Sequence, residues 1–267
     1  MDLPELPELE KVRRYLDERI IGKRVSAVTV NRRECINVPP AVYERALVGR
    51  QVQHVWRKGK TVVIDMSRDV SLLVHLMLGG DVDVRETPEH DADATQIVLA
   101  FEDGAALHIS KLMLGNAHGF PTYHLAETRL GTLGPDALTE LPDQDALQAL
   151  YGSRGRGMKV LLLDQTLVCG LGNYYADEVL FRARVHPETP GKALTAPDIT
   201  RLREAIETVI SEALDEGRPE FDRQVFAREG EPCPACGSEI KMKRIQKRAT
   251  HFCPKCQRRK SVRKKRR

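Results

Sequence analysis

The spacing of apolar residues divides the chain into a first helix, a strand-rich part and a second helical part. Residues 7–21 have the periodicity of an amphipathic helix, begin with Pro7 and stop at Gly22. The apolar face of this predicted helix consists of Leu9, Val12, Leu16 and Ile20. The first element of the chain is therefore expected to be a helix packed on a core through one stripe.

After this helix the pattern changes to short segments rich in β-branched residues and separated by turn residues. The predicted strands are 23–30, 51–56, 60–66, 71–77, 95–101 and 105–110. Such a series indicates a β-sandwich of about 120 residues. Glycines and prolines between Gly131 and Pro142 are typical of a linker, and helical periodicity follows, most clearly over 173–183 and 197–216.

These patterns predict an α+β protein with three parts. Residues 1–125 are expected to form the helix and β-sandwich domain, and residues 126–227 a helical domain. Residues 228–267 hold two CxxC pairs and are expected to form a small zinc-binding module with a basic tail.

Charge is distributed unevenly along the chain. Of the 42 Lys and Arg residues, 14 lie in residues 241–267, which contain no Asp or Glu. Residues 1–240 hold the other 28 basic residues and all 38 acidic residues, so they carry a net charge of −10. A solvated basic tail is the plain explanation. Basic charge around a metal module is, however, the usual mark of nucleic-acid binding, and we favour that interpretation.

Composition also limits the location of the protein. No apolar run approaches the roughly 18 residues of a membrane span, and the acidic start does not resemble a signal peptide. A cytoplasmic protein without membrane contact is expected. In that reducing compartment paired cysteines favour metal over disulfides, whereas Cys35 and Cys169 are expected to be buried small hydrophobes.

The metal ligands are predicted from their spacing. The pairs Cys233/Cys236 and Cys253/Cys256 are separated by sixteen residues, and each forms a knuckle that aims two thiolates at one tetrahedral ion. Four cysteines close the coordination sphere, so one structural Zn²⁺ is expected. The intervening residues alternate like a hairpin, with Arg248 near its tip.

Three separated motifs resemble one known family. PELPELE at residues 4–10, VCGLGNYYADEVLFRARVHP at 168–187 and QKRATHFCPKCQ at 246–257 are together similar to the formamidopyrimidine-DNA glycosylase and endonuclease VIII family. The resemblance implies a helix, two-turn, helix element that grips the DNA backbone, and DNA held in a cleft between two domains. It also implies a monomer that binds damaged or abasic duplex DNA.

The resemblance also implies site residues. Asn173 and Arg248 would contact phosphates beside the damaged nucleotide, with Lys60 and Lys159 as further phosphate or catalytic contacts. Alternatives remain for each: Asn173 as a helix cap, Arg248 as a structural tie in the hairpin, and the lysines as solvated side chains. Glu178, which also matches a family motif, has a helix-surface role as its alternative.

The family's chemistry uses the α-amine of an N-terminal proline to attack the sugar C1′, with a carboxylate matched here by Glu5. Here Pro4 follows Met1, Asp2 and Leu3, and Asp2 is expected to preserve the initiator Met. The Pro4 nitrogen then lies in an amide and is not a nucleophile. Four alternatives follow: Met1 supplies the amine, another amine such as Lys60 supplies it, the Schiff-base step is absent, or trimming of the N-terminus exposes Pro4. Glu8, also a family match, would be a first-turn charge.

Two further regions depart from the family pattern. The family fills the gap left by an extruded base with a set resembling Met, Arg and Phe, whereas this chain offers Leu78 and Met113 or Leu114 and no matching Arg. Residues 215–232 are shorter than the lesion-capping stretch of oxidised-purine enzymes. We therefore do not expect 8-oxoguanine to be the substrate.

The sequence thus predicts a DNA repair glycosylase that hydrolyses the N-glycosidic bond of an extruded damaged base, with AP-lyase activity left open. The first alternative is a non-catalytic protein that binds damaged or abasic DNA. The second is a zinc-ribbon factor of transcription or translation, which the motif at 168–187 argues against. The lesion, the opposite base and the strand preference are not determined by the sequence.

Overall fold

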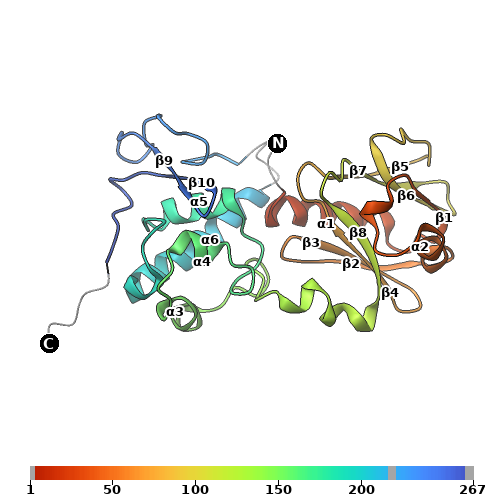
Figure 1. The fold of residues 1–267 in the computed structure, drawn as a ribbon, viewed down its shortest axis with the longest axis horizontal. Helices are drawn as coiled ribbons and strands as arrows, with labels where there is room; N and C mark the ends of the chain where they lie inside the picture. The colour runs from red at the N-terminus through yellow and green to blue at the C-terminus, as the bar shows by residue number, and fades with distance from the viewer. Residues whose placement is uncertain (1–3, 216–220, 262–267) are drawn as a thin grey trace. The chain divides into compact units, whose positions relative to one another are not determined.

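The computed structural model describes residues 4–215 and 221–261, and the chain forms two compact units, Met1–Thr132 and Leu133–Arg267. The first unit contains a helix and a β-sandwich, and the second contains helices and a hairpin that carries a four-cysteine cluster (Figure 1). The predicted α+β class is confirmed. Among the described helices, none has the length and apolarity needed to cross a bilayer.

The first helix, α1 (Leu6–Ile20), lies within one residue of its predicted bounds. Glu5 is its N-cap residue, Pro7 lies in its first turn, and the backbone N–H of Glu5 donates to Oε2 of Glu8 at 3.0 Å as one half of a capping box. Leu9, Leu16 and Ile20 of the apolar stripe are buried and Val12 is half-buried, and Gly22 ends the helix region with a φ of +81° that favours glycine.

Two four-stranded antiparallel sheets form the sandwich, with strand orders β1-β6-β7-β5 and β2-β3-β4-β8. Their bounds are β1 (Val25–Val30), β2 (Val52–Lys58), β3 (Thr61–Met66), β4 (Val70–His75), β5 (Asp81–Arg85), β6 (Thr95–Phe101), β7 (Ala106–Ser110) and β8 (Asn116–Pro121). The strand β3 shows the packing, because Val62, Ile64 and Met66 are almost fully buried in a core shared with the second sheet and α1.

All six predicted strands are present, but β5 and β8 were not predicted. The sequence DVDVR of β5 alternates aspartates with valines over only five residues, and β8 contains Gly119 and ends in Pro121, so both resemble turns. Strand pairing at the edges of the sheets stabilises them instead. The first unit also holds the helices η1 (Arg33–Cys35), α2 (Pro40–Leu47), η2 (Thr122–Glu127) and η3 (Arg129–Thr132).

The second unit is built on a helical core. Its helices are α3 (Gln144–Gly152), α4 (Met158–Leu162), α5 (Asn173–Arg182), η4 (Gly191–Ala193) and α6 (Ala196–Leu214). The two helices predicted most clearly correspond to α5 and α6. The long helix α6 buries Ile199, Leu202, Ile206 and Val209, which follow its helical period, and it packs on α5.

A two-stranded hairpin completes the second unit, with β9 (Lys241–Ile245) paired to β10 (Arg248–Phe252). Gln246 and Lys247 form its two-residue turn and both have positive φ, 46° and 66°, as a turn of type I′ requires. The hairpin expected from the alternating sequence is therefore present, and Arg248 directly follows the turn.

Candidate functional site

The four cysteines of the CxxC pairs come together at the base of the hairpin. Their sulfur atoms all lie within 4.8 Å of one another, with Cys233 Sγ 3.9 Å from Cys256 Sγ and Cys236 Sγ 3.5 Å from Cys253 Sγ. A tetrahedral Zn²⁺ with Zn–S bonds of about 2.3 Å places its sulfur ligands about 3.8 Å apart. The donor set and spacing fit one structural Zn²⁺.

The remaining two cysteines lie elsewhere and are buried, as predicted. Cys35 belongs to the sandwich core, and Cys169 packs beside Gly134 and Asp136 in the second unit. Neither joins the four-cysteine cluster, so the zinc ligands are the two CxxC pairs alone among the described cysteines.

Asn173 begins α5 but does not cap it. Gly172 occupies the N-cap position, and the Asn173 side chain instead donates from Nδ2 to the backbone oxygen of Ala249 on β10 at 3.0 Å. The capping alternative for Asn173 is therefore wrong. Its Oδ1 atom is buried and has no hydrogen-bond partner within the described part of the chain. This bond places the start of α5 beside the residue that follows the exposed Arg248.

Lys159, expected at a phosphate, is 1% exposed. Its Nζ donates to Oδ1 of Asp177 and to the backbone oxygen of Asn173, both at 2.6 Å. The second oxygen of Asp177 accepts the backbone N–H of His251 at 2.9 Å. This chain of contacts ties α4, α5 and β10 together, so Lys159 is placed to position Asn173 and the hairpin and is not exposed for direct phosphate binding.

Glu178 is 2% exposed, so its helix-surface alternative is wrong. Its carboxylate accepts the backbone N–H groups of Gln224, Val225 and Phe226 at 3.0, 3.1 and 2.8 Å. Burial raises the pKa of Glu178, while these three hydrogen bonds oppose the rise. The residue therefore anchors the segment that leads from α6 into the zinc module.

In the first unit, the N-terminal motif places a carboxylate inside the structure. Glu5 is 3% exposed at the start of α1, and Glu8 occupies the first turn and closes the capping box, as its alternative role anticipated. Pro4 is half-buried, and its nitrogen is bonded to Leu3 in the sequence. Met1 lies outside the described residues.

Lys60 lies in the tight turn between β2 and β3, where its backbone oxygen is 2.5 Å from Nδ1 of His75. The preceding residues explain how this turn is held. Arg57, 7% exposed, donates to Oε2 of Glu10 at 3.1 Å and to the backbone oxygen of Gly59 at 2.9 Å. The sequence does not predict this pair, because a buried partner on α1 produces no local sequence pattern.

The predicted gap-filling residues lie on two loops of the first unit. Met113 and Leu114, between β7 and β8, are 58% and 71% exposed, which is unusual for such large apolar side chains. This loop packs beside the loop that follows β4: a Cβ atom on Gly115 would lie 2.6 Å from the backbone oxygen of His75. Leu78 belongs to that second loop and is half-buried.

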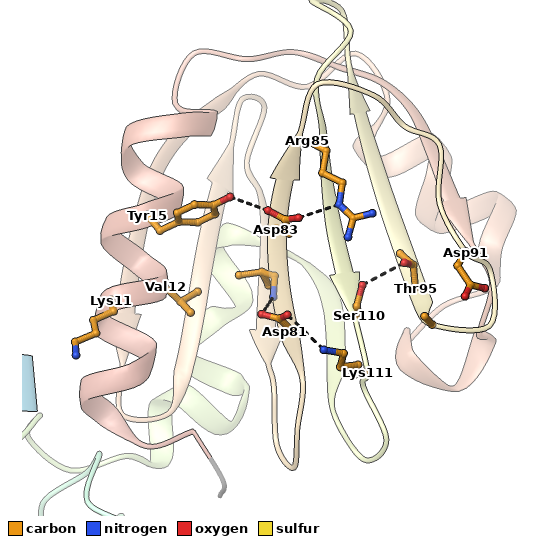
Figure 2. Close-up of a pocket in the computed structure, with 12 residues that line it drawn as sticks. Lys11, Val12, Tyr15, Asp81, Asp83, Arg85, Asp91, Thr95, Ser110 and Lys111 are labelled. Carbon is orange, nitrogen blue, oxygen red and sulfur yellow. Dashed lines mark hydrogen bonds and ion pairs between the residues drawn. The ribbon is translucent and has the colours of Figure 1, made fainter. Parts of the chain in front are cut away.

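A separate cavity of about 510 Å³ lies between α1 and the strands β5 to β7 of the first unit (Figure 2). Several of its polar side chains contact one another: Tyr15 donates to Oδ1 of Asp83 at 3.0 Å, Arg85 donates to Oδ2 of Asp83 at 2.8 Å, and Lys111 lies 3.8 Å from Asp81. No residue predicted to be catalytic or DNA-binding lines it, so it lies apart from the candidate site.

Three family models match successive parts of the chain. The formamidopyrimidine-DNA glycosylase N-terminal domain matches residues 3–112, its helix, two-turn, helix domain matches 133–223, and the zinc finger found in this glycosylase and in isoleucyl-tRNA synthetase matches 230–259. Together these models span most of the chain.

Curated relatives and solved structures agree with these matches. Formamidopyrimidine-DNA glycosylases of Listeria innocua and Pediococcus pentosaceus are 32% and 34% identical to this chain, covering 96% of it and 100% and 99% of the relatives. The Lactococcus lactis enzyme bound to DNA containing an AP site is 29% identical, with a TM-score of 0.87 and coverage of 96% and 100%. The same enzyme in complex with N7-benzyl-Fapy-dG DNA has a TM-score of 0.86. The chain belongs to the formamidopyrimidine-DNA glycosylase family of DNA repair enzymes.

Proposed function

We propose that this protein binds duplex DNA at a damaged nucleotide, extrudes the base and cleaves its N-glycosidic bond, with Asn173 and Arg248 at the flanking phosphates. The observation that carries this assignment is the hydrogen bond from Asn173 to Ala249, which joins the start of α5 to the strand that begins with Arg248. A helix N-terminus and an exposed guanidinium are both suited to phosphate oxygens. The zinc hairpin carries Arg248, and the bond from Asn173 to Ala249 joins this hairpin to the start of α5.

Glu5 is the proposed acid–base residue for base release. Hydrolysis breaks the bond between C1′ and the base nitrogen, adds the oxygen of water to C1′ and returns a proton to the departing base. A carboxylate beside the sugar assists the water and moves that proton. Glu5 is buried at the N-cap of α1, so its carboxylate is held by the helix and is not free in solvent.

The amine for a lyase step is not assigned to Pro4. While Leu3 remains attached, the Pro4 nitrogen is an amide, whose lone pair is delocalised into the carbonyl and does not attack C1′. The Met1 α-amine and the ε-amine of Lys60 in the β2–β3 turn are the proposed candidates, and loss of the Schiff-base step is the remaining case. Because Pro4 does not supply the amine, lyase activity is expected to be weak relative to base release, or absent.

The extruded base leaves a gap that Leu78, Met113 and Leu114 are proposed to fill. Insertion of apolar side chains offsets the unstacking of the neighbouring bases. The loops 76–80 and 111–115 contain no Arg, so the guanidinium that would read the opposite base is missing. Excision is therefore expected to depend little on which base lies opposite the lesion.

One experiment tests catalysis and the nucleophile together. Base release from lesion-bearing duplexes is measured for the wild type, Glu5→Gln, Glu8→Gln and Pro4→Ala, and abasic DNA is trapped with borohydride before peptide mapping. Glu5→Gln keeps a capping oxygen and should still lose most base release, whereas Glu8→Gln and Pro4→Ala should retain it. An adduct on a free N-terminal Pro4 contradicts the assignment, and an adduct on Met1 or Lys60 identifies the amine.

The same experiment separates the alternative function. A non-catalytic protein would bind abasic or damaged DNA and release no base from any lesion tested.

The cysteine cluster also supports a cytoplasmic location, because a reducing compartment keeps the four thiols available to zinc. Cell fractionation tests that part of the proposal.

A further inference from the structure

A second cavity of the first unit, with a volume of about 560 Å³, lies on the outer face of the sheet β2-β3-β4-β8. Strands β3, β4 and β8 form its floor, and the segment of η2 and η3 forms its wall. All of its lining residues lie between Thr61 and Leu130, so they belong to one unit. The volume lies within the range of about 300 to 1,000 Å³ that is typical of pockets for small molecules.

The alternation of the strands determines which side chains form this floor. Leu72 of β4 and Ala117 of β8 belong to the sandwich core. Successive side chains of a strand point to opposite faces, so Leu73, His75 and His118 lie on the outer face. Leu73 and His118 are direct cross-strand partners, so an apolar side chain and an imidazole lie side by side on the floor.

Flat and apolar side chains surround the space. The rings of His118 and Phe120 lie edge-to-face, with their centroids 6.2 Å apart. Leu73 and Leu130 add apolar surface and are themselves buried, and His124 contributes a third ring. Such walls favour a planar ring system over a flexible molecule, because the faces of a planar ring gain dispersion contacts with them.

Several polar side chains of this cavity have no hydrogen-bond partner in the described part of the chain. Throughout residues 4–215 and 221–261, the side chains of Asn116, His118 and Arg129 take part in no hydrogen bond or ion pair, although Asn116 and His118 are half-buried. The cavity beside α1 differs, because several of its polar side chains contact one another. Partly desolvated donors and acceptors without partners are stabilised when a ligand supplies the missing bonds.

His75 keeps an acceptor nitrogen for such a ligand. Its Nδ1 atom lies 2.5 Å from the backbone oxygen of Lys60, and a carbonyl oxygen only accepts, so Nδ1 carries the proton. Burial lowers the pKa of His75 despite this bond, and the positive charges of Arg129 and Lys60 lower it further. Burial also lowers the pKa of His118. Both rings are therefore neutral at pH 7, and Nε2 of His75 is an acceptor.

The cavity carries no net charge. Among the described residues that line it, only Glu127 and Arg129 are charged at neutral pH, and their charges are opposite. An anion such as a phosphate group would meet a carboxylate as well as a guanidinium, which reduces its attraction. The side chains thus favour a neutral ligand that has both donors and acceptors.

We propose that this cavity binds a free oxopurine base. An oxopurine is planar and neutral, and it carries N–H donors beside carbonyl and ring-nitrogen acceptors. His118 and Phe120 contact its rings, Nε2 of His75 accepts a ring N–H, and Arg129 donates to its carbonyl oxygen. The proposal goes beyond the glycosylase function and does not depend on it, because the ligand is not attached to DNA. Free bases are also the class of product that cleavage of an N-glycosidic bond releases.

Binding of hypoxanthine to the full chain with its zinc tests the proposal, by calorimetry and by saturation-transfer NMR. The wild type should bind hypoxanthine saturably with a dissociation constant of about 0.1 to 1 mM, the range for a ligand of about ten non-hydrogen atoms. Inosine 5′-monophosphate should bind about 10-fold more weakly, because its phosphate is repelled by Glu127. This arm separates a free base from a nucleotide.

Two variants locate the site. His118→Leu removes a flat wall and two ring nitrogens and should weaken hypoxanthine binding by about 10-fold. Arg129→Gln removes one charge-assisted hydrogen bond at an exposed position and should weaken it by about 5- to 10-fold. His54→Leu is the matched control, since His54 is an exposed histidine of β2 that does not line the cavity. Thermal unfolding and zinc content verify that each variant is folded.

A DNA competition separates the cavity from the DNA-binding residues. None of the side chains proposed to contact DNA lines the cavity, so a saturating tetrahydrofuran-containing duplex should leave hypoxanthine binding unchanged. Displacement of hypoxanthine by the duplex would overturn the proposal. So would the absence of saturable binding, equal binding by the wild type and both variants, or binding of inosine 5′-monophosphate as tight as that of hypoxanthine.

Discussion

The β-sandwich and the zinc hairpin reach a stable fold by different means. The sandwich buries a continuous apolar core, in which residues such as Ile64, Leu72 and Ile97 are fully covered by the two sheets. Around the hairpin the buried apolar residues are few, chiefly Val225 and Ile240 beside the cysteines. The stability of the sandwich therefore depends on buried apolar area, whereas that of the hairpin depends on a metal ion and directional polar contacts.

Removal of zinc should have the largest effect, and it should affect the zinc hairpin and not the β-sandwich. Cys256→Ser leaves three ligands, so the hairpin should unfold and DNA binding should be lost, because zinc affinity in such modules, about 10 to 16 kcal/mol, is folding free energy. Zinc content, circular dichroism and DNA affinity measure this. Cys35→Ala is the control and should retain zinc; full DNA binding by the metal-free protein would contradict the assignment.

The second largest effect should come from the buried ion pairs, one in each unit. Lys159→Met leaves Asp177 buried without its ammonium partner and should lower the free energy of unfolding of its unit by about 3 to 5 kcal/mol. Arg57→Met should cost less, because Glu10 keeps contacts with Arg13 and Arg14 at 2.9 and 3.4 Å.

Denaturant unfolding of both variants measures this difference. The double variant Lys159→Met/Asp177→Leu should recover much of the loss, because no unpaired charge is then buried. A small effect of Lys159→Met on unfolding, combined with a large loss of DNA affinity, would instead return Lys159 to a direct phosphate contact.

Arg248→Ala should weaken binding to tetrahydrofuran-containing duplex by about 1 to 3 kcal/mol without changing the fold, because one charge-assisted hydrogen bond to phosphate is lost. The slope of log affinity against log salt should become shallower by about 1. Arg19→Ala is the control, an exposed arginine on α1 that lies 3.3 Å from Glu18. An unchanged affinity and salt slope would leave Arg248 with a structural role.

The smallest effect should depend on pH and concerns Asp198 on α6. Burial raises the pKa of Asp198, but hydrogen bonds from Lys260 and Thr195 outweigh it and lower the pKa to about 2. Since the folded-state pKa lies below that of the unfolded chain, the stabilisation is present above about pH 4 and is lost as the pH falls toward 2.

Asp198→Asn should therefore lower stability by about 1 kcal/mol near neutral pH, a value reduced for the half-exposed Lys260 and Arg201, and by almost nothing at pH 2. Urea unfolding across this range measures the difference. A stability difference that does not change with pH would mean that Asp198 acts through its hydrogen bonds to Thr195 and not through its charge.

Local sequence patterns predicted much of the fold but few of the buried contacts that hold the site residues in place. The helix α1, six strands, α5, α6 and the hairpin all have a periodicity that the sequence displays directly. Glu178 and Lys159 were predicted as surface or DNA-facing groups, because nothing in the neighbouring sequence reveals their buried partners. The predicted domain borders at 125 and 227 and the DNA roles of the site residues remain predictions.

The sequence by itself determined the zinc ligands and the family, because ligand spacing and motif order are properties of the chain alone. Only the tertiary structure decided what surrounds each side chain: Asn173 bound to Ala249, Lys159 to Asp177, and Phe221 against Tyr174. These contacts join residues 18 to 76 positions apart. Burial, hydrogen-bond partners and the resulting pKa shifts depend on that three-dimensional neighbourhood, which no local period encodes.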